Sequence, residues 1–194
     1  MKSFRDYLQE AASDVAVVTK TTLPEIYLDM DETIVDWMAG ANKALKDAGH
    51  PEWHADHWNK YSETEADKIR WDILNNTPNF WENLPWTKDG KQIWNFVKKY
   101  KPNILSACGT LAGSICKDGK KRWLAANLGY NNIRSVYLVL RSEKKNYAVV
   151  NGKPTVLIDD YGKNCDEYDA AGGIAVQVTT GSAVINKLKQ LGYT

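Results

Sequence analysis

The sequence predicts an α/β fold in which helices cover both faces of a mostly parallel sheet. Short apolar runs of strand length alternate with segments of helical periodicity, which is typical of this class. Acidic or hydroxyl side chains follow several of the apolar runs, as expected where a sheet carries a site along one edge. The 194 residues suffice for one well-packed domain with room for a small insertion.

The elements follow in an order that fits this class. The first strand is Ile26–Leu28, and the next helix begins near Asp36, with Ala41, Leu45 and Ala48 on one face and Gly49 at its end. Before the strand, residues 1–24 form an accessory segment in which four apolar positions with helical spacing predict a short amphipathic helix (Phe4, Tyr7, Leu8 and Ala11). Later strands are predicted at residues 103–107, 136–140, 155–158 and 174–178, and later helices around Ile93–Val97, Trp123–Leu128, Asn164–Ala171 and Ile185–Leu191.

Residues 50–86 differ from this pattern and predict a small helical insertion. Five tryptophans fall in this stretch among many polar residues (Trp53, Trp58, Trp71, Trp81 and Trp86). A helix over residues 64–75, with Ile69, Ile73 and Leu74 facing inward, would end at Thr77-Pro78 because proline disfavours helix in the residue before it. The core would then comprise residues 25–49 and 87–194.

The overall composition excludes several classes of function. The 25 Lys and Arg nearly balance the 24 Asp and Glu, so the net charge of +1 indicates neither a nucleic-acid-binding nor a membrane-surface protein. No apolar stretch approaches the roughly 20 residues of a membrane span, and the N-terminus lacks the features of a secretory signal. Cys108, Cys116 and Cys165 have no CxxC spacing and fit no disulfide framework, so we expect a reducing cytoplasm and treat Cys108 and Cys116 as small buried residues.

Polar side chains lie at or just after four predicted strand ends. Asp29 and Asp31 follow the first strand, Ser106 the second, Lys144 and Lys145 the third, and Asp159 with Asp160 the fourth. Because side chains two apart on a strand point the same way, Asp29 and Asp31 emerge together. Each acidic pair alone is equally compatible with a helix-capping turn. Four polar groups converging on one edge indicate a site.

Phosphoryl transfer is the chemistry these groups could perform together. Asp29 and Asp159 offer oxygen ligands for Mg²⁺, which takes one or two carboxylates plus water and substrate phosphate. A lysine supplies positive charge toward an anionic substrate, and Ser106 with nearby backbone N–H groups can hold phosphate oxygens. Asp31 can protonate the leaving oxygen and later activate water.

The motifs resemble those of the haloacid dehalogenase (HAD) superfamily of phosphatases. The stretch Asp29-Met30-Asp31-Glu32-Thr33 is similar to its first motif, Ile104–Ala107 to its second and Leu157–Asp160 to its fourth, across residues 25–180. The resemblance implies a Rossmann-like three-layer α/β/α core with a small helical C1-type cap.

Within the superfamily, the chain is most similar to the 5′(3′)-deoxyribonucleotidases and their phage and bacterial relatives. Phe80–Pro85 is similar to the cap exit of that branch, and Leu157–Asn164 with Ala171–Gly173 to its C-terminal pattern. Glu32 departs from the branch, which has glycine at that position. A phage or bacterial source fits this resemblance, with a host cytoplasm as the location if the protein is phage-encoded.

The resemblance assigns a role to each site residue. Asp29 would be the nucleophile and Asp31 the acid/base, while Ser106 and Lys144 would bind phosphate. Mg²⁺ would be held by the Asp29 carboxylate, the Asp31 main-chain oxygen and Asp159, with Asp160 as a further candidate. Substrate contacts are assigned to Thr33, Trp37 and Ala107.

Several alternatives stay open in the sequence. Lys145 competes with Lys144, and Trp37 could pack in the core instead of contacting a base. Lys117–Arg122 is expected to be a solvated helix start, with a face toward a phosphate-bearing substrate as the alternative. The substrate is expected to be a small phosphomonoester, with a nucleoside monophosphate favoured. A sugar phosphate, a nucleic-acid 3′-phosphate end and a non-catalytic binding module are the competing functions.

Overall fold

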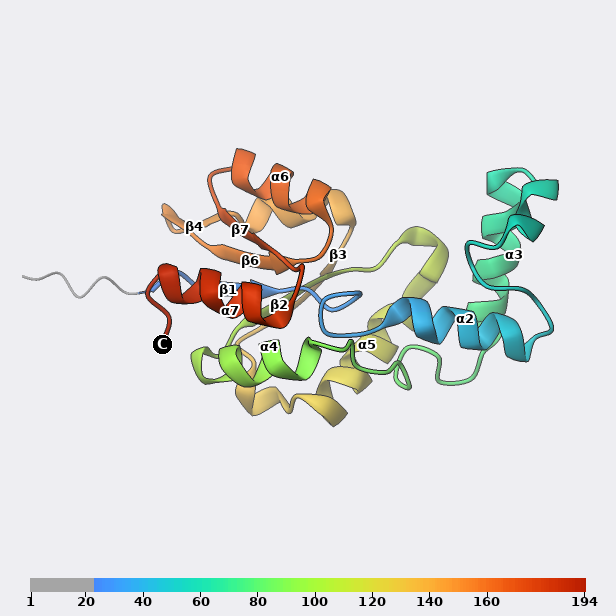
Figure 1. The fold of residues 1–194 in the computed structure, drawn as a ribbon, viewed down its shortest axis with the longest axis horizontal. Coiled ribbons are helices and arrows are strands. Elements are labelled where there is room, and N and C mark those ends of the chain that lie inside the picture. Colours follow the sequence, from blue (N-terminus) through green and yellow to red (C-terminus); the bar gives the residue numbers. More distant parts are fainter. Residues whose placement is uncertain (1–22) are drawn as a thin grey trace, which may run out of the picture.

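A computed structural model describes residues 23–194, so the helix predicted around Phe4 to Ala11 lies outside the described residues. Five parallel strands form the central sheet in the order β3-β2-β1-β6-β7 (Figure 1). Their bounds are β1 Ile26–Leu28, β2 Asn103–Ala107, β3 Val136–Val139, β6 Val156–Asp159 and β7 Ile174–Gln177. The predicted parallel sheet is confirmed, because each predicted strand is present within a residue or two of its expected position.

Side chains alternate between the two faces of the sheet and thereby build two cores. Ile26 and Leu28 of β1 belong to the larger apolar cluster together with α4 (Gly90–Val97), α5 (Gly113–Asn127) and α7 (Gly181–Gln190). Tyr27 faces the other way, into a smaller cluster that includes Tyr168 of α6 (Gly162–Ala170). In Figure 1, α6 accordingly lies on one side of the sheet and α4 and α7 lie on the other. The result is the expected three-layer α/β/α arrangement.

Residues 50–86 contribute no strand to this sheet. They contain the 3₁₀ helix η1 (Asp56–Lys60) and α3 (Glu63–Asn76), and α3 packs against α2 (Trp37–Asp47) away from the sheet (Figure 1). The predicted helix is confirmed, with a capping box formed by Ser62 and Glu65 at its start. Leu74 is buried as expected, whereas Ile69 and Ile73 are half-buried.

Four short 3₁₀ helices and a two-stranded hairpin lie outside the central sheet. The remaining 3₁₀ helices are η2 (Lys98–Tyr100), η3 (Thr110–Ala112), η4 (Tyr130–Asn132) and η5 (Arg141–Tyr147). Strands β4 (Val149–Val150) and β5 (Lys153–Pro154) form an unpredicted antiparallel hairpin. Its turn is Asn151-Gly152, both with positive φ, which is the strongest short hairpin signal in a sequence.

Two local predictions are wrong. Ala48 was expected on the inner face of α2 but is exposed, because the helix ends at Asp47 and Ala48 is its C-cap. Cys108 and Cys116 are buried as predicted, but they form a disulfide. The turn between them brings their Cα atoms to 6.1 Å, within the range a disulfide needs, and this proximity is not visible in a spacing of eight residues.

Candidate functional site

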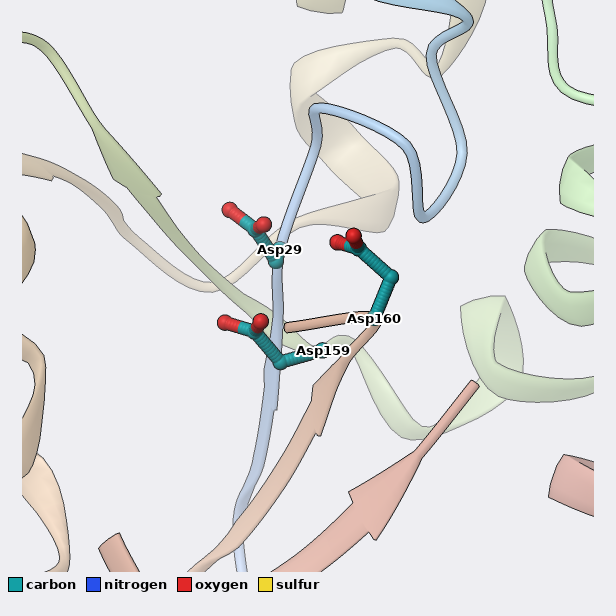
Figure 2. A group of neighbouring side chains, drawn as sticks. All are labelled: Asp29, Asp159 and Asp160. Carbon is teal, nitrogen blue, oxygen red and sulfur yellow. The ribbon is translucent and has the colours of Figure 1, made fainter. Parts of the chain in front are cut away.

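The carboxyl ends of β1, β2 and β6 meet at one edge of the sheet and bring the predicted side chains together. Asp29 directly follows β1, and its backbone N–H donates to Ile158 O of β6 at 2.9 Å. Asp159 ends β6, and Asp160 follows it. One side-chain oxygen of each of Asp29, Asp159 and Asp160 lies within 4.8 Å of the others (Figure 2). The first and fourth predicted strand ends therefore form one acidic cluster.

Lys144 joins two members of this cluster. Its ammonium lies 2.9 Å from Asp29 Oδ1 and donates to Asp159 Oδ2 at 2.7 Å. Although burial disfavours the charged ammonium, the two carboxylates outweigh it and raise the pKa of Lys144 well above its usual value. Lys145 is exposed, so the structure brings Lys144 rather than its neighbour into the site.

The remaining bonds of Asp159 and Asp160 fix their orientation. Asp159 Oδ1 accepts from the Tyr161 backbone N–H at 2.9 Å, and Asn164 Nδ2 donates to both Asp159 oxygens. Thr33 Oγ1 donates to Asp160 Oδ1 at 3.2 Å and accepts from the Asp160 backbone N–H at 3.1 Å. Burial, followed by repulsion from Asp29 and Asp159, raises the pKa of Asp160 to about 7. Thr33 thus belongs to the site, and its contact with substrate stays a prediction.

Lys120 is a second buried cation that the sequence analysis placed in solvent. It is fully buried on α5, and its Nζ donates to Asp31 Oδ2 at 2.6 Å, to Ser106 Oγ at 2.9 Å and to Ala107 O at 2.7 Å. An ammonium has three N–H donors, so all three are used. The expectation of a solvated helix start is wrong for this residue. The sequence contains a signal for this burial. Lys120 shares one helical face with three apolar residues, Cys116, Trp123 and Leu124.

Asp31 differs from the clustered acids in its partner. Its Oδ2 pairs with Lys120, whereas its Oδ1 is buried and has no hydrogen-bond partner among the described residues. Burial raises the pKa of Asp31 despite the opposing effect of Lys120. Its side chain stands outside the acidic cluster, and coordination through its main-chain oxygen stays a prediction.

Trp37 lies at the start of α2 among other indole rings. Its ring centroid is 4.9 Å from that of Trp53 and 5.7 Å from that of Trp71, and the side chain is half-buried. Trp81 continues this group of rings, because its centroid lies 6.3 Å from that of Trp71, and it also lies 5.4 Å from Lys120 Nζ. Trp37 therefore has a packing role, and a contact with substrate stays a prediction.

Comparisons with known proteins identify the fold. No protein-family model matches the chain, and no curated protein is significantly similar in sequence. Solved structures do match: L-2-haloacid dehalogenase from Xanthobacter autotrophicus superposes with a TM-score of 0.57 and 14% identity, over 87% of this chain and 83% of that one. The fold is that of the HAD hydrolases.

Two further structures with this HAD fold extend the likeness. The HAD-hydrolase YfnB from Bacillus subtilis, bound to magnesium, has a TM-score of 0.54 at 12% identity and covers 81% of this chain and 87% of that one. A predicted phosphoglycolate phosphatase from Haemophilus somnus has a TM-score of 0.51 at 15% identity, covering 84% and 88%. Among the described residues, no helix has the length and apolar character needed to cross a membrane.

Proposed function

We propose that this protein is a Mg²⁺-dependent phosphomonoester hydrolase that works through an aspartyl-phosphate on Asp29. The observation that carries the proposal is the surroundings of that carboxylate. It is 5% exposed, lies 2.9 Å from the Lys144 ammonium and shares a cluster with two further acids. A carboxylate so placed can attack phosphorus while nearby positive charge offsets its repulsion from an anionic substrate.

The side chains divide the reaction between them. An Asp29 oxygen forms a bond to phosphorus as the ester oxygen leaves, and Asp31 donates the proton that this oxygen needs. Asp31 then takes a proton from water, which attacks phosphorus, releases inorganic phosphate and restores the Asp29 carboxylate. Lys144 stays protonated throughout and supplies positive charge.

Lys120 supports this division by its hydrogen bonds. It holds one oxygen of Asp31 and leaves the other, Oδ1, free for proton transfer. Because it also donates to Ser106 Oγ, the serine hydroxyl can direct its own proton to a phosphate oxygen.

The residues present fit a magnesium ion. The four site carboxylates and two buried lysines sum to a formal charge of −2, which one divalent cation balances. Oxygen ligands at this density suit Mg²⁺, and Asp29, Asp159 and Asp160, with the Asp31 main-chain oxygen, would hold it. When bound, the ion would neutralise charge on the transferring phosphoryl group.

For the substrate, we propose a small phosphomonoester, with a (deoxy)nucleoside 5′-monophosphate favoured. The support is the sequence resemblance together with Trp37, whose half-buried ring offers a surface on which a base can stack. A sugar phosphate or a 3′-phosphate end is the alternative within the same chemistry. The structural likeness to L-2-haloacid dehalogenase adds halide displacement as an alternative reaction. The Asp31–Lys120 pair favours phosphate hydrolysis, because a halide leaves without needing a proton.

A substrate panel with Mg²⁺ tests the proposal. Phosphate release would be measured from 5′-dNMPs, 5′-NMPs, sugar phosphates, 3′-phosphorylated oligonucleotides and para-nitrophenyl phosphate, and chloride release from L-2-chloropropionate. We expect Asp29→Asn to retain the fold and to lower phosphate release by more than about 10³-fold. EDTA should abolish wild-type turnover. The matched control for Asp29→Asn is Asp118→Asn, which changes an exposed aspartate on α5 in the same way.

Undiminished activity in Asp29→Asn would overturn the assignment of Asp29 as the nucleophile. Mg²⁺ binding with no turnover of any phosphoester would instead favour the non-catalytic binding module.

A further inference from the structure

The loop that follows β1 contains a residue whose conformation and contacts the proposed reaction does not explain. Glu32 is exposed and adopts φ = +54°, a left-handed conformation that is unfavourable for a non-glycine residue. It stands directly after Asp31, the proposed acid/base. A strained backbone at this position needs compensating contacts.

Two hydrogen bonds supply that compensation. The Glu32 backbone N–H donates to Val35 O at 2.7 Å, which closes the loop on itself. The Glu32 side chain accepts from the backbone N–H of Met38 at 2.7 Å, which joins the tip of the loop to the first turn of α2. The base of the same loop is held by Met30 O, which accepts from three successive backbone N–H groups (Thr33, Ile34 and Val35).

Helix capping alone does not account for the side-chain bond. Asp36 is already the N-cap of α2, and its Oδ1 accepts from the Ala39 backbone N–H at 2.8 Å. Glu32 therefore adds a second carboxylate to a helix start that has its own cap. Besides capping the helix, the Glu32–Met38 hydrogen bond connects α2 to the peptide that joins Asp31 to Glu32.

We propose that Glu32 is a positioning residue that holds Asp31 in place by clamping the loop after β1 to the start of α2. The Asp31–Glu32 peptide carries the Asp31 main-chain oxygen, so the clamp sets the direction of that oxygen. It also fixes the backbone from which the Asp31 side chain reaches Lys120. The inference deepens the proposed function and rests on it.

Two substitutions at this position separate the clamp from backbone strain. Glu32→Gln keeps an oxygen acceptor, so we expect wild-type kcat. Glu32→Gly removes the acceptor and also removes the cost of the left-handed conformation, so the variant should fold well while the loop is released. We expect its kcat with para-nitrophenyl phosphate and Mg²⁺ to fall about tenfold at unchanged KM, because small displacements of an acid/base group lower the rate.

The matched control is Asp36→Ala, which removes the ordinary cap of the same helix without touching the loop. We expect it to lower the melting temperature and to leave kcat at the wild-type value. A kcat loss in Asp36→Ala equal to that in Glu32→Gly, or wild-type kcat in Glu32→Gly, would overturn the clamp.

Amide hydrogen exchange gives a readout that needs no turnover. Glu32→Gly should speed exchange at the amides of residues 32–35, and Asp36→Ala should speed it only within the first turn of α2. Equal exchange in residues 32–35 of all variants overturns the inference, whereas a wild type that hydrolyses no phosphoester overturns the proposed function alone.

Discussion

Buried charge characterises one region of the molecule, and buried aromatic rings characterise another. The strand-end site contains six charged side chains: Asp29, Asp31, Lys120, Lys144, Asp159 and Asp160. The aromatic segment, residues 50–86, contains five tryptophans and a single buried arginine, Arg70. The first region was predicted, except for Lys120, from polar residues at strand ends, and the second from its tryptophans. Their side chains are stabilised in different ways.

In the strand-end site each cation has specific anionic partners. Lys144 joins Asp29 to Asp159, and Lys120 joins Asp31 to Ser106. Such pairs contribute little net stability, because desolvation offsets their attraction, but losing one partner leaves a costly buried charge. The site is therefore sensitive to single substitutions.

The one buried cation of the aromatic segment pairs with a single acid, Asp67, and also packs against two tryptophan rings. The Arg70 guanidinium lies 4.5 Å from the Trp53 ring centroid and 5.5 Å from that of Trp58, and it donates to Trp53 O at 2.8 Å. The Trp53 ring also meets the rings of Trp37 and Trp71 edge-on within the same cluster. We infer that the proposed chemistry depends on the first region and that the second mainly supplies rigid apolar packing.

Among the substitutions that compare the two regions, Lys120→Met should have the largest effect. It leaves the half-buried Asp31 carboxylate without its partner, and we expect a loss of about 3 kcal/mol in the free energy of unfolding. Hydrolysis should fall by about 10²-fold, because Asp31 loses the bond that orients it. Chemical denaturation and steady-state kinetics would measure the two effects. Lys121→Met, its exposed neighbour on α5, is the control and should behave as wild type; equal behaviour of the two variants would contradict the role of Lys120.

Trp53→Ala tests the packing role of the aromatic segment. It removes a ring that is 9% exposed, and we expect about 3 kcal/mol of destabilisation from lost packing. At a temperature where the variant is folded, kcat for para-nitrophenyl phosphate should remain near the wild-type value. Tyr61→Ala, at a more exposed ring of the same segment, should cost much less stability. A kcat loss as large as that of Lys120→Met would show that the two regions are not separable.

The smallest expected effect is a change in stability that depends on pH and on magnesium. Burial raises the pKa of Asp160 to about 7 and also raises that of Asp159. The folded chain therefore retains protons that an unfolded aspartate releases near pH 4. In the metal-free protein these groups make stability fall as the pH rises from about 4 to about 7.

Mg²⁺ binds the deprotonated carboxylates, so it should raise the melting temperature more at pH 8 than at pH 5.5. Thermal denaturation with and without the ion would measure this difference. Asp160→Asn should reduce it, and a magnesium shift independent of pH would contradict a site built from these acids.

The strand-end acids were predictable because parallel strands all end at the same edge. Asp29 and Asp159 follow apolar runs that could only be buried strands, so their meeting follows from strand direction alone. The resemblance favoured Lys144 over Lys145, but only the structure shows that Lys144 is buried and Lys145 exposed, since adjacent lysines in a polar turn look equivalent by residue type. The Cys108–Cys116 disulfide also needed it, because closure depends on the shape of the intervening turn.

By itself, then, the sequence determined the parallel sheet, the edge that carries the acids and the aromatic character of residues 50–86. These follow from short-range patterns of apolar and polar residues. Only the tertiary structure decided that Lys120 is buried against Asp31 and Ser106, and that Glu32 reaches Met38 from a left-handed backbone. A lysine on a helix face and a glutamate in a loop are ordinarily solvated, and their surroundings come from segments distant in the chain or from a turn that local propensity disfavours.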